Sequence, residues 1–97
     1  MIIVRETFEA KYGRGDELVA LLKEGSEMLA ERAGSAPRIL TDLSGQFFTI
    51  QMETEMESLS AFEESQKVMA DPRFGPWFER MIDLVETGRR DFLNIEQ

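Results

Sequence analysis

The stretch from Ser58 to Val85 limits the fold of this 97-residue chain more than any other segment. It contains four of the nine aromatic residues, including the only tryptophan, and segments rich in strand formers flank it. This arrangement favours a helix that crosses over between two strands. The helix is predicted to start at Ser58 or at Ser60, whose spacing from Glu63 is that of a capping box. The Asp71-Pro72 pair predicts a second start, with Asp71 as N-cap and Pro72 as the first helical residue.

The rest of the chain supplies four predicted strands and one further predicted helix. Apolar and polar residues alternate in the segments expected to form strands, which are 1–11, 38–44, 47–54 and 89–96. Leucines at helical spacing predict a helix over 16–33, with Asp16 as N-cap and Gly34 at its C-terminal end. Gly45-Gln46 is expected to form a tight hairpin turn, and Gly88 is expected to end the second helical region.

The order strand-helix-strand-strand-helix-strand predicts the fold class. It is typical of an α+β protein in which two helices pack on one face of a four-stranded antiparallel sheet. The expected architecture is therefore a two-layer ferredoxin-like sandwich (βαββαβ), formed by a single domain over residues 1–97.

The composition excludes several classes of partner. Eleven basic and nineteen acidic residues give a net charge of −8, which disfavours binding to nucleic acid and to anionic membrane surfaces. The absence of cysteine fits a cytoplasmic protein. The apolar run Ile2–Val4 is too short for a signal peptide or a membrane span. The sequence has no motif for a metal or a cofactor, so neither is expected.

The sheet face that two helices leave uncovered predicts an assembly. A solvated face would be cleanly polar, but apolar residues fall on both faces of the expected strands: Ile2 and Ile3, Phe47 and Phe48, Phe92 and Leu93. On the uncovered face they are mixed with the polar residues Arg5, Thr7, Thr49, Gln51 and Asn94. Such a face favours a homodimer in which two sheets enclose a partly polar cavity. The alternative is that these apolar groups tolerate exposure.

Four segments of the chain resemble one superfamily of known proteins. They are the opening IIVRETFEAKYGRGDEL, the strand FFTIQMETE, the helix start SLSAFEESQ and the following DPRFGPWFERM. Together with the βαββαβ order they resemble the dimeric α+β barrel superfamily, and within it the antibiotic-biosynthesis-monooxygenase-like and NIPSNAP-like domains. The resemblance extends over nearly the whole chain. It implies a homodimer whose two sheets face each other around a barrel cavity.

The superfamily implies two kinds of activity. Its members include cofactor-independent monooxygenases that act on aromatic polyketides, and enzymes that degrade haem. The haem-degrading members need an axial histidine, and this chain has no histidine. The monooxygenase members use a tryptophan and polar groups around a quinol substrate. Trp77 is not matched to that tryptophan, so no catalytic residue is assigned.

Six residues are candidates for ligand binding, namely Arg5, Thr7, Thr49, Gln51, Trp77 and Asn94. Arg5 is expected to point into the cavity, where it would bind an anionic ligand oxygen or pair with Glu9, Glu53 or a carboxylate of a second copy. The polar strand residues would bind a carbonyl-bearing ligand or face solvent. Trp77 and its aromatic neighbours would wall a pocket for a planar ligand, or belong to the core or the dimer interface.

Three functions agree with these residues. The first is the binding of a small, largely apolar molecule with a carbonyl or hydroxyl group in the barrel cavity. The second is cofactor-independent monooxygenation of an aromatic quinol, which the resemblance alone implies. The third is a non-catalytic assembly domain with a filled barrel, in which the face carrying Phe47, Thr49 and Phe92 packs dry against a second copy.

Overall fold

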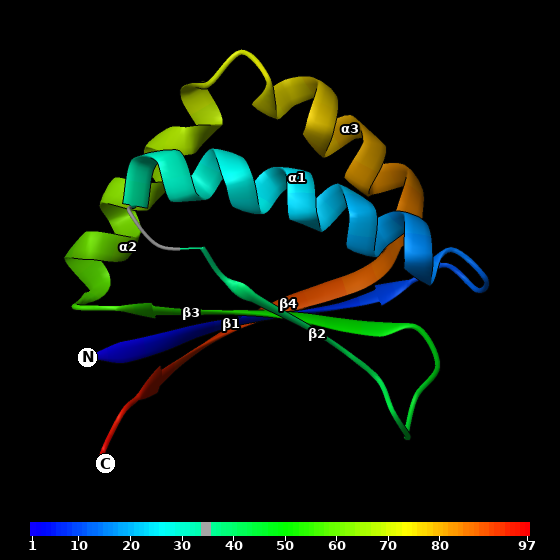
Figure 1. The fold of residues 1–97 in the computed structure, drawn as a ribbon, viewed down its shortest axis with the longest axis horizontal. Helices are drawn as coiled ribbons and strands as arrows, with labels where there is room; N and C mark the ends of the chain where they lie inside the picture. Colours follow the sequence, from blue (N-terminus) through cyan, green and yellow to red (C-terminus); the bar gives the residue numbers. More distant parts are fainter. Residues whose placement is uncertain (34–35) are drawn as a thin grey trace.

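A computed structural model describes residues 1–33 and 36–97, so the prediction for Gly34 lies outside the described residues. The elements are β1 (Ile2–Ala10), α1 (Gly15–Ala33), β2 (Arg38–Thr41), β3 (Thr49–Met56), α2 (Leu59–Ser65), the 3₁₀ helix η1 (Gln66–Ala70), α3 (Phe74–Leu84) and β4 (Val85–Asn94). The strands form one antiparallel sheet in the order β2-β3-β1-β4. The helices all lie on one side of this sheet (Figure 1). The predicted ferredoxin-like α+β fold is therefore confirmed.

The core lies between α1 and the sheet. Leu18, Leu21 and Leu22 of α1 are fully buried, as expected for the leucine stripe of an amphipathic helix. They belong to one apolar cluster with Ile50 and Met52 of β3. Burial of each such side chain contributes roughly 1.5–3 kcal/mol, so this cluster fixes α1 on the sheet. No helix in the described part of the chain has the length and apolar character needed to cross a membrane.

The helix starts differ in detail from the predicted ones. The structure selects Ser58 and not Ser60 as the N-cap of α2, because the Ser58 hydroxyl accepts a hydrogen bond from the backbone N–H of Ala61 at 3.2 Å. Helix α1 begins at Gly15, so Asp16 lies in its first turn and not at the N-cap. An acidic residue in the first turn still interacts favourably with the helix dipole.

The Asp71-Pro72 pair does not start α3. Both residues lie in the turn after η1, and α3 begins at Phe74. The Asp71 carboxylate instead accepts hydrogen bonds from the backbone N–H of Arg73 at 2.9 Å and from the Arg73 guanidinium. Asp71 thus stabilises the turn before the helix, which is a role that the N-cap prediction missed.

The connection between β2 and β3 is a loop over residues 42–48 and not a tight turn at Gly45-Gln46. Gly45 and Phe48 have left-handed backbone angles, with φ of 92° and 61°. The Phe48 ring packs edge-on against Tyr12 with 4.9 Å between the ring centroids. As a result the strand expected over 47–54 is displaced to Thr49–Met56.

Gly88 lies inside β4 and does not end a helix, because α3 passes directly into β4 at Val85. Gly88 is opposite Phe8 of β1, and a Cβ added to it would lie 3.0 Å from Phe8 Cδ1. The glycine therefore leaves room for the ring of its cross-strand neighbour.

Candidate functional site

The outer sheet face is the side of the sheet that the helices leave uncovered. Directly opposed residues of neighbouring strands share a face. The register therefore places fourteen residues on the outer sheet face, namely Ile3, Arg5, Thr7, Glu9, Arg38, Leu40, Thr49, Gln51, Glu53, Glu55, Thr87, Arg89, Asp91 and Leu93. Only Ile3, Leu40 and Leu93 among them are apolar, so the face is much more polar than predicted.

Three residues predicted on this face lie elsewhere. Asn94 is opposite Ile2 in the β1–β4 register, which places it on the helical side of the sheet. Phe92 is on the same side, where its ring is 5.0 Å from the ring of Phe62. Phe47 belongs to the loop before β3. The dry face that was predicted around these phenylalanines is therefore not formed.

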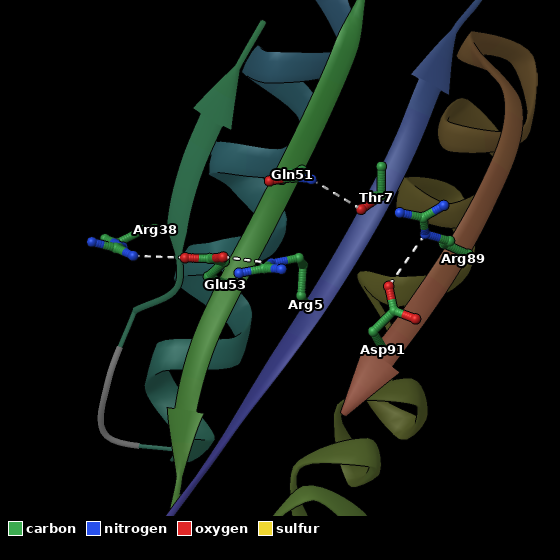
Figure 2. Close-up of polar contacts among 7 residues, drawn as sticks. All are labelled: Arg5, Thr7, Arg38, Gln51, Glu53, Arg89 and Asp91. Carbon is green, nitrogen blue, oxygen red and sulfur yellow. Dashed lines mark hydrogen bonds and ion pairs between the residues drawn. The ribbon is translucent and has the colours of Figure 1, made fainter. Parts of the chain in front are cut away.

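Polar groups of the outer sheet face bind one another (Figure 2). Glu53 accepts hydrogen bonds from Arg38 Nη2 and Arg5 Nε, both at 2.6 Å, so its carboxylate links three neighbouring strands. The bond from Arg38, and then that from Arg5, hold the pKa of Glu53 below its ordinary value. Gln51 donates to Thr7 Oγ1 at 3.3 Å. Of the alternatives left open for Arg5, the structure shows the pairing with Glu53.

Thr49 stands at the start of β3, where the loop holds it. Its backbone N–H donates to Asp42 Oδ1 at 3.1 Å, and its hydroxyl donates to the Gln46 carbonyl at 2.9 Å. Thr49 lines an open hollow of about 500 Å³ together with Thr7 and Gln51. Three of the six candidate residues are thus brought together here, but each side chain already takes part in a hydrogen bond within the chain.

Trp77 lies on the opposite side of the sheet, between α1 and α3. Its indole N–H donates to the backbone carbonyl of Leu21 at 2.7 Å. Its ring lies against Gly25, where an added Cβ would be only 2.5 Å from Trp77 Cζ2. Trp77 therefore takes part in helix packing, and it does not share a site with Arg5.

A second hollow, which we call the inner cavity, lies between the helices and the helical side of the sheet. Its volume is about 340 Å³, and its walls come from α1, η1, α3 and the three strands β1, β3 and β4. Four of the six methionines, two phenylalanines of α3 and the only tryptophan gather there, namely Met28, Met52, Met69, Met81, Phe74, Phe78 and Trp77. Methionine and aromatic side chains thus make up much of the wall of this cavity.

Two charged residues that sequence reasoning did not single out also line the inner cavity. Glu6 of β1 and Arg90 of β4 are opposed in the register, and Arg90 Nη2 donates to Glu6 Oε2 at 2.9 Å. The guanidinium carbon of Arg90 is 5.0 Å from the centroid of the Phe62 ring. Glu6 could have been noticed in the sequence, because it interrupts the apolar side of β1. Arg90 could not have been identified from the sequence, since its side of the sheet depends on where β4 begins.

Comparisons with known proteins identify the fold. No protein-family model matches the chain, and no curated protein is significantly similar to it in sequence. A NIPSNAP family protein of unknown function from Agrobacterium tumefaciens is similar in structure, with 22% identity over 96% of this chain and 86% of that one and a TM-score of 0.84. An uncharacterised NIPSNAP domain protein from Burkholderia xenovorans has 17% identity over 98% and 94% of the two chains and a TM-score of 0.82.

The structural similarity extends to proteins named as antibiotic biosynthesis monooxygenases. A candidate antibiotic biosynthesis monooxygenase from Deinococcus radiodurans has 18% identity over 100% of this chain and 94% of that one, with a TM-score of 0.75. The chain therefore has the fold that NIPSNAP proteins share with antibiotic-biosynthesis-monooxygenase-like proteins, as the resemblance implied.

Proposed function

We propose that this protein binds a small, largely apolar molecule with a carbonyl or hydroxyl group, and that the inner cavity is the binding site. The observation that carries this proposal is the lining, in which methionine and aromatic side chains predominate and polar groups are few. Small-molecule sites have this composition, and about 340 Å³ is near the lower end of their volumes. Methionine side chains adapt to the shape of a ligand, which suits such a site.

The inner cavity favours binding more than the outer sheet face does. A ligand that competed with Glu53 for Arg5 would disturb a carboxylate that is only 10% exposed and that Arg38 also binds, which is costly. A ligand in the inner cavity covers apolar surface instead, which contributes roughly 25 cal/mol per Å². The same molecule would therefore bind more tightly beneath the helices than against the sheet.

Phe78→Ala is expected to weaken binding in the inner cavity about tenfold, because it removes an aromatic wall worth about 1–2 kcal/mol. Phe78 is 44% exposed, so the fold should tolerate the change. The neutral probe N-phenylnaphthylamine can be titrated while the fluorescence of Trp77, the only tryptophan, is recorded. Phe47→Ala is the matched control, since Phe47 is 68% exposed and lies in the loop before β3. Equal affinities of the two variants, or no binding to the wild type, would reject this site.

A second candidate function is the cofactor-independent oxidation of a bound hydroxylated aromatic molecule by oxygen. It is supported by the names of two fold neighbours, the candidate antibiotic biosynthesis monooxygenases from Deinococcus radiodurans and Nitrosomonas europaea. An apolar cavity also excludes water from a reactive substrate. Oxygen uptake with a hydroxylated anthrone should exceed the uncatalysed rate and survive dialysis against a chelator. If the protein binds the anthrone but oxygen uptake stays at the uncatalysed rate, the oxidation function is rejected and the binding function remains.

We further propose that the outer sheet face joins two copies of the chain. This face carries three arginines and four carboxylates, a net charge of −1, whereas the rest of the chain carries −7 of the total −8. Two copies that meet across this face therefore bring together little of the chain's negative charge. A two-fold interface there would also cover Ile3, Leu40 and Leu93.

Leu93→Glu is expected to convert the homodimer into a monomer at low micromolar concentration. The change places one new carboxylate on each side of a symmetric interface, where like charges repel. Leu59→Glu is the control, because Leu59 is also exposed but lies on α2, in the helical layer. Sedimentation equilibrium should give a dimer for the wild type and for Leu59→Glu. A monomeric wild type, or a dimeric Leu93→Glu, would contradict the proposed interface.

A further inference from the structure

The ion pair of Glu6 and Arg90 stands out among the groups that line the inner cavity. In the described part of the chain these two are the only charged side chains of the lining, and the remainder is mostly apolar. Glu6 is 23% exposed and Arg90 is 41% exposed, so the pair lies where the cavity meets solvent. Gln66 of η1 also lines the cavity, one helical turn after the Phe62 that Arg90 contacts. The cavity thus has a polar mouth and an apolar body.

Glu6 holds Arg90 by a single hydrogen bond, which a ligand carboxylate that binds two donors can replace. A guanidinium offers five N–H donors, and the single contact to Glu6 Oε2 at 2.9 Å uses one of them. By comparison, Arg73 of the same chain binds two carboxylates, those of Asp71 and Glu31. The contact with the Phe62 ring holds the Arg90 guanidinium in place. Arg90 is therefore a positioned anion receptor beside an apolar space.

We propose that the ligand of the inner cavity is a monocarboxylate with an apolar body, and that Arg90 binds its carboxylate. This inference rests on the proposed binding function of the cavity. The ligand carboxylate takes the place that Glu6 holds, and the partly exposed Glu6 turns to water. The apolar body lies against the methionine and aromatic lining.

The charges explain why a carboxylate is preferred to other head groups. The exchange of one carboxylate for another leaves Arg90 paired, and the planar guanidinium matches both carboxylate oxygens. A neutral alcohol leaves the Glu6–Arg90 pair in place and gains at most one ordinary hydrogen bond. An amine of the same length would pair with Glu6 through a single point charge, whereas a carboxylate would be bound by two parallel N–H donors of Arg90. The order of affinity should therefore be carboxylate, alcohol, amine.

The test compares decanoate, decanol and decylamine, which share one apolar body, by isothermal calorimetry near neutral pH. Decanoate is expected to bind about tenfold more tightly than decanol, and decylamine is expected to bind weakest. Arg90→Gln should remove most of the advantage of decanoate and leave decanol unchanged. Glu6→Gln should strengthen decanoate binding several-fold, because it removes the competing carboxylate. A naphthoate and naphthol pair tests whether a planar body fits as well as a flexible chain.

Arg80→Gln is the matched control, since Arg80 pairs with Glu24 across α3 and α1 and does not line the inner cavity. Equal affinity for decanoate and decanol, or an equal loss of both in Arg90→Gln, would overturn the assignment while the binding function stands. Weaker decanoate binding in Glu6→Gln would overturn it as well, even if Arg90→Gln failed to fold. A wild type that binds neither these compounds nor N-phenylnaphthylamine would instead reject the binding function itself.

Discussion

Replacing Gly25 by alanine is expected to destabilise the protein by about 2 kcal/mol, although the same change stabilises most exposed helices by about 1 kcal/mol. Gly25 lies in the middle of α1, where a glycine is normally unfavourable. The reason for it is Trp77, because an added Cβ would lie 2.5 Å from Cζ2 and 2.8 Å from Cε2 of the indole. The ring would have to move, and its hydrogen bond to the Leu21 carbonyl would be strained or lost.

A double-mutant cycle isolates this contact. Trp77→Leu alone is expected to cost about 3 kcal/mol, since it removes a large packed ring. In that background Gly25→Ala should become neutral or stabilising by up to about 1 kcal/mol, because only the helix propensity remains. Unfolding in denaturant, followed by circular dichroism, gives the four free energies. The same loss from Gly25→Ala in both backgrounds would show that the tryptophan is not the cause.

The order of elements could be predicted because it depends on residues that are near one another in the sequence. The stripe of Leu18, Leu21 and Leu22 predicted α1, and these three side chains are the fully buried ones of that helix. In β1, the alternation that puts Arg5 and Thr7 on the uncovered face leaves Ile2 and Val4 on the helical side, where both are buried. Local patterns of this kind are set by the geometry of a single helix or strand.

The faces of β4 could not be predicted in the same way. A strand alternates with a period of two, so its faces depend entirely on its register with β1. That register puts Phe92 and Asn94 on the helical side. Gly88, which was expected to end the helix, lies inside β4 and makes room for Phe8, which is 80 positions away in the sequence. Such a contact leaves no trace in the local sequence.

The candidate site escaped prediction for the same reason. Glu6 and Arg90 are 84 positions apart, and only the pairing of β1 with the edge strand β4 brings them together. Arg5 and Glu53 were recognised from the sequence as possible partners. The second bond, from Arg38, could not be predicted, because that bond depends on the pairing of β2 with β3. Trp77 was predicted to wall a ligand pocket or to belong to the core or the dimer interface, and in the structure it packs against Gly25 and lines the inner cavity.

Glu53→Gln is expected to lower the free energy of unfolding by about 1–2 kcal/mol near neutral pH, because two arginines lose a charged acceptor. Glu53 itself is only 10% exposed, but Arg5 and Arg38 reach solvent, which keeps the loss below that of a fully buried pair. Glu55→Gln is the matched control on the same strand and face. Glu55 is exposed, and the described residues provide no ion pair for it, so its substitution should change stability little.

The contribution of Glu53 should also depend on pH with a definite sign. The bonds from Arg38 and Arg5 lower the pKa of Glu53 in the folded state, whereas the unfolded chain keeps the ordinary value of 4.5. The unfolded state therefore binds more protons below that value, so this stabilisation is complete above pH 4.5 and is lost as the pH falls through the lowered pKa. Denaturant unfolding of the wild type and Glu53→Gln at a fixed protein concentration should give curves that converge in acid and separate towards neutral pH. A difference that stays constant across this range would mean that Glu53 acts through packing and not through its charge.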